Sequence, residues 1–261
     1  MLTSLGRTAL SFLLYFGELA LLVWETCVSI VVAPLRWRLL LRQIVEIGWR
    51  SQMVVIVTGA FTGAVLTAQT FFQFSRIGMK SAVGSVVAVA MFRELGPVLT
   101  GLMVSGRVGA AIAAEIGTMK VTEQIDALRA LGVHPIDYLV VPRVLAIMIS
   151  MPLLVAEACA ISIAAARYVS WQVLSVTGPY DWYNTRHYVG SRDLEMALAK
   201  GVVFAVIIVF IACHQGLNTK NGAVGVGRAP TESVVLGSLA ILILNFFLTF
   251  ALNIIFPAGF I

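Results

Sequence analysis

Long apolar runs divide the chain into blocks of membrane length. A helix needs about 20 largely apolar residues to cross a bilayer, and five blocks meet that requirement. They cover about residues 52–74, 83–114, 144–169, 200–216 and 233–257. The pattern therefore predicts an all-α integral membrane protein, with a transmembrane domain over 49–261 that follows an N-terminal helical region over 1–48.

The first apolar run, residues 3–33, carries a stripe of polar side chains. Hydroxyl groups and carboxylates recur at steps of four and three residues, which is the spacing of one helical face. The members are Ser4, Thr8, Ser11, Tyr15, Glu18, Glu25 and Ser29, and only Leu22 interrupts the series. Two glutamates inside a lipid-spanning helix would be costly, so we predict an amphipathic helix in the membrane interface. The alternative is a sixth span that packs its polar stripe against the bundle.

Composition agrees with a membrane protein: 59% of the residues are hydrophobic, 12% are charged, and the mean hydropathy is +0.94. That polar content is too low to cover a soluble globule. The net charge of +5 does not indicate nucleic-acid binding, because Lys and Arg are spread between the apolar blocks and form no basic patch. No nucleic-acid partner is therefore expected.

Lys and Arg are distributed unequally between the two sides that five spans create. The side that holds the N-terminus has more of them than the other side, by a modest margin. The positive-inside rule then places the N-terminus in the cytoplasm and the C-terminus outside. The loop over 170–190 is rich in Trp and Tyr, which is typical of a headgroup region and fits the outer surface.

The connection between the second and third predicted spans has a helical pattern of its own. Thr118 or Thr122 can cap a helix over 118–131, and Gly132 followed by His134-Pro135 supplies a C-terminal stop. Its apolar side consists of Val121, Ile125, Leu128 and Leu131, and its polar side of Glu123, Gln124, Asp126 and Arg129. On the cytoplasmic side, such a helix either takes up motion from a motor subunit or merely lies on the membrane. Periodicity alone favours neither interpretation.

A family resemblance favours the interpretation in which this helix takes up motion from a motor subunit. The stretch "RELGPVLTGLMVSGRVGAAIAAEIGTMKVTEQIDALRALGVHPIDYLVVPR", residues 93–143, resembles the signature of the MlaE (YrbE, plant trigalactosyldiacylglycerol-1) permease family of ABC transporters that work with MCE proteins. Two further stretches, "LAKGVVFAV" (198–206) and "GAVGVGRAPTESVV" (222–235), are similar to other family segments. In the latter, Pro230 and Glu232 depart from a segment that more often reads as a Thr-Thr-basic run. The resemblance covers about residues 40–257.

The resemblance implies a homodimeric permease of the bacterial inner membrane that moves phospholipids or related lipids to the outer envelope. Its implied partners are two cytoplasmic ABC ATPase subunits, a ring of MCE-domain proteins outside and a small STAS-type cytoplasmic subunit. It also implies that the ATPase is coupled through Glu115, Gly117, Thr122, Glu123, Gln124, Asp126 and Leu128. The chain has no G-x-x-x-x-G-K-[ST] loop, so we expect ATP to be bound and hydrolysed by a separate chain, and no cofactor or metal here.

Arg93, Glu94 and Arg107 lie inside the otherwise apolar second span. A charge near the bilayer centre costs at least ~2.5–3.5 kcal/mol, so such residues usually face a protein interior or a wet cavity. Arg93 and Glu94 precede Pro97, where the helix can bend, and Lys200 enters from the fourth span. We predict that these four residues bind a phospholipid headgroup, with Glu94 either holding Arg93 in place or contacting a basic headgroup. A structural ion pair is the alternative for Glu94, and packing or snorkelling is the better interpretation of Arg107.

Small residues in two of the spans predict close contact between helices. They are Gly59 and Gly63 in the first span and Gly101, Ser105, Gly109 and Ala113 in the second. Each set lies on one helical face and allows a neighbouring helix to approach closely. The contact is either packing within one subunit or a dimer seam, and only the family resemblance favours the seam.

Two other classes of protein fit the intramembrane charges less well. A secondary transporter or channel would use them as an ion path, but the chain has no evident inverted repeat with interrupted helices. A membrane-embedded enzyme would need a nucleophile with a base, or a metal cluster. The three histidines, His134, His187 and His214, lie far apart in the sequence and without metal-binding spacing.

Overall fold

The computed structural model describes residues 2–32, 34, 36–174, 189–220 and 222–255, and every regular element in these ranges is helical. Six segments are long and apolar enough to cross a membrane. They are Leu13–Val32, Trp37–Arg76, Val83–Val121, Ile136–Val173, Ser191–Leu217 and Gly222–Ile255. The prediction of an all-α membrane protein is confirmed. Most of the aromatic-rich loop over 170–190, together with His187, lies outside the described residues.

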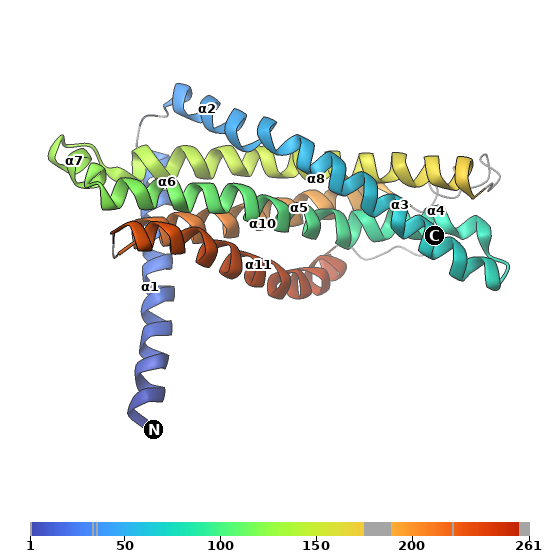
Figure 1. Cartoon of the computed structure of the whole chain (residues 1–261), viewed down its shortest axis with the longest axis horizontal. Coiled ribbons are helices and arrows are strands. Elements are labelled where there is room, and N and C mark those ends of the chain that lie inside the picture. The colour runs from blue at the N-terminus through green and yellow to red at the C-terminus, as the bar shows by residue number, and fades with distance from the viewer. Residues whose placement is uncertain (1, 33, 35, 175–188, 221, 256–261) are drawn as a thin grey trace.

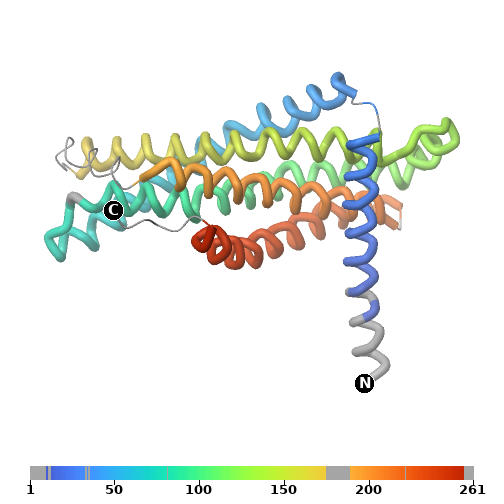
Figure 2. Tube along the Cα trace, turned by 180° about the vertical axis from the view of Figure 1, so that it is seen from behind, coloured from blue at the N-terminus to red at the C-terminus, as the bar shows by residue number. Residues whose placement is uncertain are grey.

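Apart from the first helix, the long helices lie side by side and form one elongated bundle (Figures 1 and 2). The first part of the chain forms α1 (Leu2–Val32), α2 (Trp37–Ile47) and α3 (Gln52–Arg76). The second spanning segment contains α4 (Val83–Ala90), α5 (Gly96–Val104) and α6 (Ala110–Val121), and α7 (Gln124–Ala130) follows it. The remaining helices are α8 (Val141–Tyr168), α10 (Ser191–Leu217) and α11 (Gly222–Ile255). We call the two ends of the bundle the α7 end and the α4 end.

The second spanning segment is one continuous helix with two wider turns. The π-helical turns Met91–Leu95 and Ser105–Gly109 join α4, α5 and α6 end to end. Two further π-helical turns, Ile136–Val140 and Val169–Val173, extend α8 at both ends. Because a π-turn adds a residue, each one shifts the helical face that follows it. The turn Met91–Leu95 contains Arg93 and Glu94, the charged pair noticed in the sequence.

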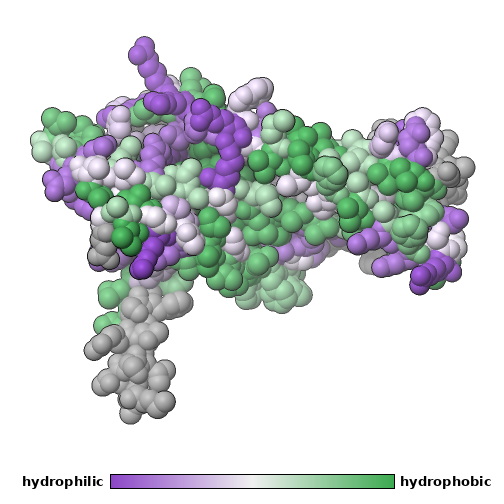
Figure 3. Space-filling model, in the orientation of Figure 1, coloured by the Kyte–Doolittle hydropathy of each residue, from purple (hydrophilic) through white to green (hydrophobic). Residues whose placement is uncertain are grey.

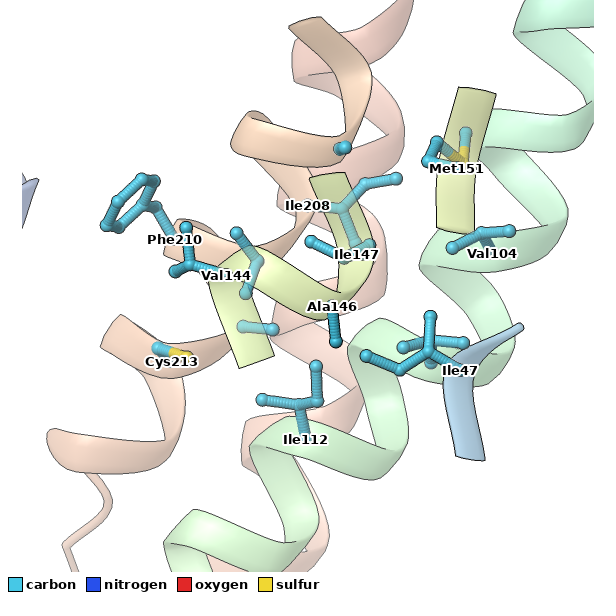
Figure 4. Packing of buried hydrophobic residues seen from close by; sticks show 14 of the residues in the cluster. Ile47, Val104, Ile112, Val144, Ala146, Ile147, Met151, Ile208, Phe210 and Cys213 are labelled. Carbon is cyan, nitrogen blue, oxygen red and sulfur yellow. The ribbon is translucent and has the colours of Figure 1, made fainter. Parts of the chain in front are cut away.

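The apolar core lies where α10 packs against α8 and α6. Ile112 of α6, Ile147 of α8 and Ile208 of α10 belong to one buried cluster (Figure 4). On the surface, apolar residues form a belt between two more polar ends (Figure 3). Burial inside the bundle and an apolar exterior are what a lipid environment requires of a helical protein.

The first helix crosses the bundle instead of running along it (Figures 1 and 2). Its polar stripe contacts the bundle: Glu18 Oε2 lies 3.2 Å from His214 Nε2, and Ser29 donates a 2.5 Å hydrogen bond to Asp137. The side chains of Ser4, Thr8 and Ser11 lie outside the described part of the chain. The segment Leu13–Val32 is apolar enough to span, yet its direction across the other helices supports the interfacial placement, which stays a prediction.

The small residues pack helices together within this chain. A Cβ atom on Gly59 would lie 3.0 Å from the carbonyl oxygen of Ala158 in α8, and one on Gly63 would overlap the backbone of Ser162. The Ser162 hydroxyl donates a 2.7 Å hydrogen bond to the carbonyl oxygen of Gly59. In the second segment, Ser105 lies so close to α11 that a Cβ atom on Gly237 would come 2.6 Å from its Oγ atom. Close helix contact is therefore present inside one subunit.

Replacing Gly63 with alanine is expected to lower the stability of the folded chain by about 1–3 kcal/mol, since the added methyl group overlaps backbone and cannot turn away. The loss is measured as a lower melting temperature in mild detergent. Gly106→Ala is the matched control, because no atom lies within 4 Å of a Cβ at that position. Equal melting temperatures for the two variants would contradict the close packing of α3 on α8.

The predicted boundaries of the short helix were wrong. The helix α6 continues to Val121, and the Thr118 and Thr122 hydroxyls donate to the carbonyl oxygens of Ala114 and Thr118 instead of capping a new helix. These bonds follow the i to i−4 pattern of residues inside or at the end of a helix. The predicted apolar side was wrong at its start, because Val121 belongs to the end of α6 and the other members belong to the region of the separate helix α7.

A turn at Glu123 separates the two helices. Glu123 has a φ of 61°, in the left-handed region that residues other than glycine rarely adopt, and α7 begins at the next residue. The predicted stop is present: Gly132 has a φ of 71°, its N–H bonds to Arg129 O, and the N–H of Val133 bonds to Leu128 O. This pair of bonds is a Schellman motif.

Candidate functional site

A proline creates an acceptor in the middle of the second spanning segment. Pro97 has no N–H, so the carbonyl oxygen of Arg93, four residues earlier, lacks its usual helical donor. The Nζ atom of Lys200, from α10, donates a 2.6 Å hydrogen bond to that oxygen. The N–H of Gly96 reaches back to Met91 O and closes the π-turn. Pro97 itself is buried and thus shapes the site through the backbone.

Lys200 is fully buried, with 0% of its surface exposed. Besides the Arg93 carbonyl, its Nζ atom donates to Glu94 Oε1 at 2.9 Å and to Thr249 Oγ1 at 3.0 Å. An ammonium group has three N–H donors, and these contacts use all three. Lys200 therefore has no donor left for a bound headgroup. Its role in this arrangement is to hold α10 against the second segment and α11.

Glu94 joins three helical segments. In addition to Lys200, it accepts hydrogen bonds from Asn245 Nδ2 and Thr249 Oγ1, both at 2.8 Å and both from α11. Its side chain is 37% exposed, whereas that of Lys200 is buried. A carboxylate that pairs with one cation and accepts two neutral hydrogen bonds is well compensated in a site of low polarity.

Arg93 has a different partner from the one predicted. Its Nε atom donates to Asp193 Oδ1 at 2.6 Å, and Asp193 is in turn fixed at the start of α10 by the N–H of Gly190 at 3.0 Å. The prediction that Glu94 holds Arg93 was wrong because adjacent residues of a helix point in directions about 100° apart. The arginine side chain is 33% exposed, and its two terminal nitrogens have no partner among the described residues. Arg93 thus offers donors that an anion can accept.

Three members of this polar cluster were missed in the sequence: Asp193, Asn245 and Thr249. A signal was present for each. Asp193 lies seven residues before Lys200, two helical turns away on the same face. Asn245 and Thr249 lie four residues apart on one face of the apolar last span. Polar residues that repeat on one face inside a membrane span usually meet a partner in the bundle.

The predicted ATPase-coupling residues fall into two groups at the α7 end. Glu115, Gly117 and Leu128 make contacts within the chain. Glu115 Oε2 lies 2.7 Å from the buried guanidinium of Arg143, and a Cβ on Gly117 would come 2.8 Å from Thr219 Oγ1. These three residues connect α6 and α7 to the rest of the bundle.

The other coupling residues are exposed, as is half of the Glu115 side chain. They are Thr122, Glu123, Gln124 and Asp126, at the turn between α6 and α7 and on the first turn of α7. Asp126 is paired with Arg129 at 3.1 Å and with Lys120 at 3.5 Å, and exposed pairs of this kind contribute little to stability. The helix α7 lies at the extreme end of the bundle (Figure 1). The exposed group is accessible there to a protein partner.

Arg107, in the same spanning segment, contacts the turn between α2 and α3 and not the polar cluster. Its Nη1 atom donates a 2.5 Å hydrogen bond to the Ser51 hydroxyl, which itself donates to Ile47 O. The arginine is half-buried. This contact ties the second segment to the junction of α2 and α3.

Together, these features define a multi-pass α-helical membrane protein with a polar site between its helices and an exposed helix at one end. The description "Permease MlaE" belongs to a family model that matches residues 40–251. The chain belongs to the MlaE permease family.

Relatives cover most of the chain. A protein of Rickettsia felis named "Probable ABC transporter permease protein" is 44% identical over 94% of this chain and 95% of its own length. A protein of Synechocystis with the same type of name is 41% identical over 80% of both chains. Protein TRIGALACTOSYLDIACYLGLYCEROL 1 of Arabidopsis thaliana is 36% identical over 86% of this chain and 64% of its own length.

Proposed function

We propose that the chain is the permease subunit of an ABC transporter that moves phospholipids between the inner membrane and an MCE-protein conduit to the outer envelope. The names of the bacterial relatives support the class of transporter, and the Arabidopsis relative is named after a lipid. ATP is bound and hydrolysed by a separate subunit. This chain supplies the lipid pathway and the surface that receives the motion.

The observation that carries this proposal is the arrangement around Arg93. Its guanidinium has one nitrogen fixed on buried Asp193 and two terminal nitrogens that have no partner in the described part of the chain. That geometry suits a phosphate, which accepts two parallel hydrogen bonds from an arginine. Lys200 and Glu94 then act as positioning residues, because their donors and acceptors are used within the bundle. Pro97 contributes by freeing the carbonyl oxygen that Lys200 binds.

The same proposal assigns protein partners and a side of the membrane to each end of the bundle. Two ATPase subunits of a homodimeric transporter dock on the α7 end, where the exposed coupling residues lie, and a small STAS-type subunit is a further cytoplasmic partner. The MCE ring covers the α4 end in the periplasm. The N-terminus then lies in the cytoplasm and the C-terminus in the periplasm, in agreement with the excess of Lys and Arg on the α7 side.

The test is photo-crosslinking of a phospholipid probe to the chain in proteoliposomes that also contain the co-purified ATPase. Arg93→Gln is expected to lose most of the crosslinked product and most ATP-dependent lipid transfer, since the phosphate loses its charged partner. Arg76→Gln, an exposed arginine at the same end of the bundle, is the matched control. Normal crosslinking and transfer in Arg93→Gln would refute the headgroup site. Lipid transfer without ATP would favour a secondary transporter instead.

A further inference from the structure

A charged cavity lies at the α7 end of the bundle, far from Arg93. It has a volume of about 460 Å³ and is enclosed by α2, by α6 and by the turn that leads into α8. Arg42, Arg107 and Arg143 line it, one from each side. Glu115, in the same wall, follows Arg93 by 22 residues, which places the two sites roughly 30 Å apart along the helix.

The cavity has more positive charge than its own carboxylates neutralise. Arg143 is only 3% exposed; it donates to Leu139 O and to Glu115, and its buried Nε atom has no hydrogen-bond partner among the residues that the structure describes. Arg107 uses one donor, on Ser51. Arg42 has no hydrogen bond or ion pair within the described ranges.

The two glutamates of the wall are already paired. Glu115 binds Arg143, and Glu46 binds Arg50, which lies outside the cavity. Buried charges and donors are costly when they are left unmatched. Of the three arginines, only Arg143 is buried with a donor left unmatched among the described residues, while Arg42 is exposed and Arg107 is half-buried. An anion that reaches Arg143 and also accepts from the two more accessible guanidinium groups therefore suits this cavity.

Most of the remaining wall is apolar, and Leu39, Ile47, Val108, Ile112, Met119 and Leu139 are among the residues that line it. Large apolar side chains are exposed every four residues along α2 and the turn after it, at Trp37, Leu41, Val45 and Trp49. Tryptophans at the ends of an apolar stripe are typical of the boundary between lipid and water. An amphiphile with an anionic head can thus enter from the surrounding membrane.

We propose that this cavity binds the phosphate group of an anionic phospholipid, with its acyl chains along the apolar wall beside α2. The phosphate contacts Arg42 and Arg107 and supplies the missing acceptor for Arg143. A bound lipid joins α2 to α6 and α8 next to the Glu115–Arg143 pair. The site is separate from the headgroup site at Arg93, and its lipid is bound there regardless of which cargo the chain transports.

The test is native mass spectrometry of the purified chain with phosphatidylglycerol and with phosphatidylcholine of the same acyl chains. The double variant Arg42→Gln/Arg107→Gln is expected to lower the affinity for phosphatidylglycerol by at least about tenfold, because each removed contact is a charged hydrogen bond. Arg38→Gln, on the same helix but outside the cavity lining, is expected to bind as the wild type does. Phosphatidylcholine is expected to bind more weakly to the wild type.

Three further measurements keep the inference falsifiable. Ala111→Phe fills the cavity without changing any charge, so it is expected to reduce phosphatidylglycerol binding as well. Arg93→Gln is expected to remove only the lipid bound at the headgroup site and to leave the lipid held by Arg42 and Arg107 in place, so failure of the transport proposal and failure of this one are separate results. Millimolar inorganic phosphate is expected to leave the lipid bound. Equal phosphatidylglycerol binding by all variants, or its displacement by inorganic phosphate, would overturn the proposal.

Discussion

Replacing Glu94 with leucine is expected to destabilise the folded chain by about 3–5 kcal/mol, because the ammonium group of Lys200 then stays buried without its counter-charge. Lys200 is 0% exposed and cannot reach water without moving α10 away from the second segment. The free energy of unfolding is measured in mild detergent, by chemical denaturation or by thermal melting.

A second replacement, made together with Glu94→Leu, identifies the residue that pairs with Glu94. Adding Lys200→Met to Glu94→Leu removes both charges, so most of the lost stability is expected to return. Adding Arg93→Met to Glu94→Leu is the matched control and is expected to give no recovery, because Arg93 is paired with Asp193. If Arg93→Met restores stability as well as Lys200→Met does, the pairing described for the polar cluster is wrong.

Reversing the charge of Glu123 is expected to reduce ATP-dependent lipid transfer and the lipid-stimulated ATPase activity by at least about tenfold. Glu123 is exposed at the turn before α7, and a like-charge contact in an interface costs several kcal/mol. Insertion and melting temperature are expected to stay near wild type, since the Glu123 side chain has no partner in the described part of the chain. The measurement is ATP turnover by the reconstituted transporter.

The control for that experiment is Glu25→Lys, which makes the same change of charge on an exposed residue of α1 at the same end of the bundle. It is expected to retain normal activity. Normal lipid-stimulated ATPase activity in Glu123→Lys would show that α7 does not couple the permease to the ATPase through this residue.

The spans could be predicted from the sequence because each depends on a local property, the length of an apolar run. The stop at Gly132 was also local, since one residue with positive φ ends α7. The start of α7 could not be predicted in this way, because Glu123 adopts a positive φ that its residue type disfavours. Such a conformation depends on the surrounding folded structure.

The members of the polar cluster were partly predictable, but their pairs were not. Arg93, Glu94 and Lys200 stood out as charges in apolar runs, and they do lie together. Their partners depend on the rotation of three helices about their own axes, which the π-turn at Met91–Leu95 alters. A regular helix assumed from the sequence gives the wrong face to every residue beyond that turn.

Glu94 is synthesised well before the residues that pair with it. Its cation, Lys200, is 106 residues further along the chain, and Thr249 is 155 residues further. At about 5–20 residues per second, the ribosome needs roughly 5–20 s to make the lysine after the glutamate. Throughout that interval the carboxylate has no counter-charge, so the second segment stays near the aqueous boundary or within the insertion machinery. Its final depth in the bilayer is therefore reached only when the fourth and last spans arrive.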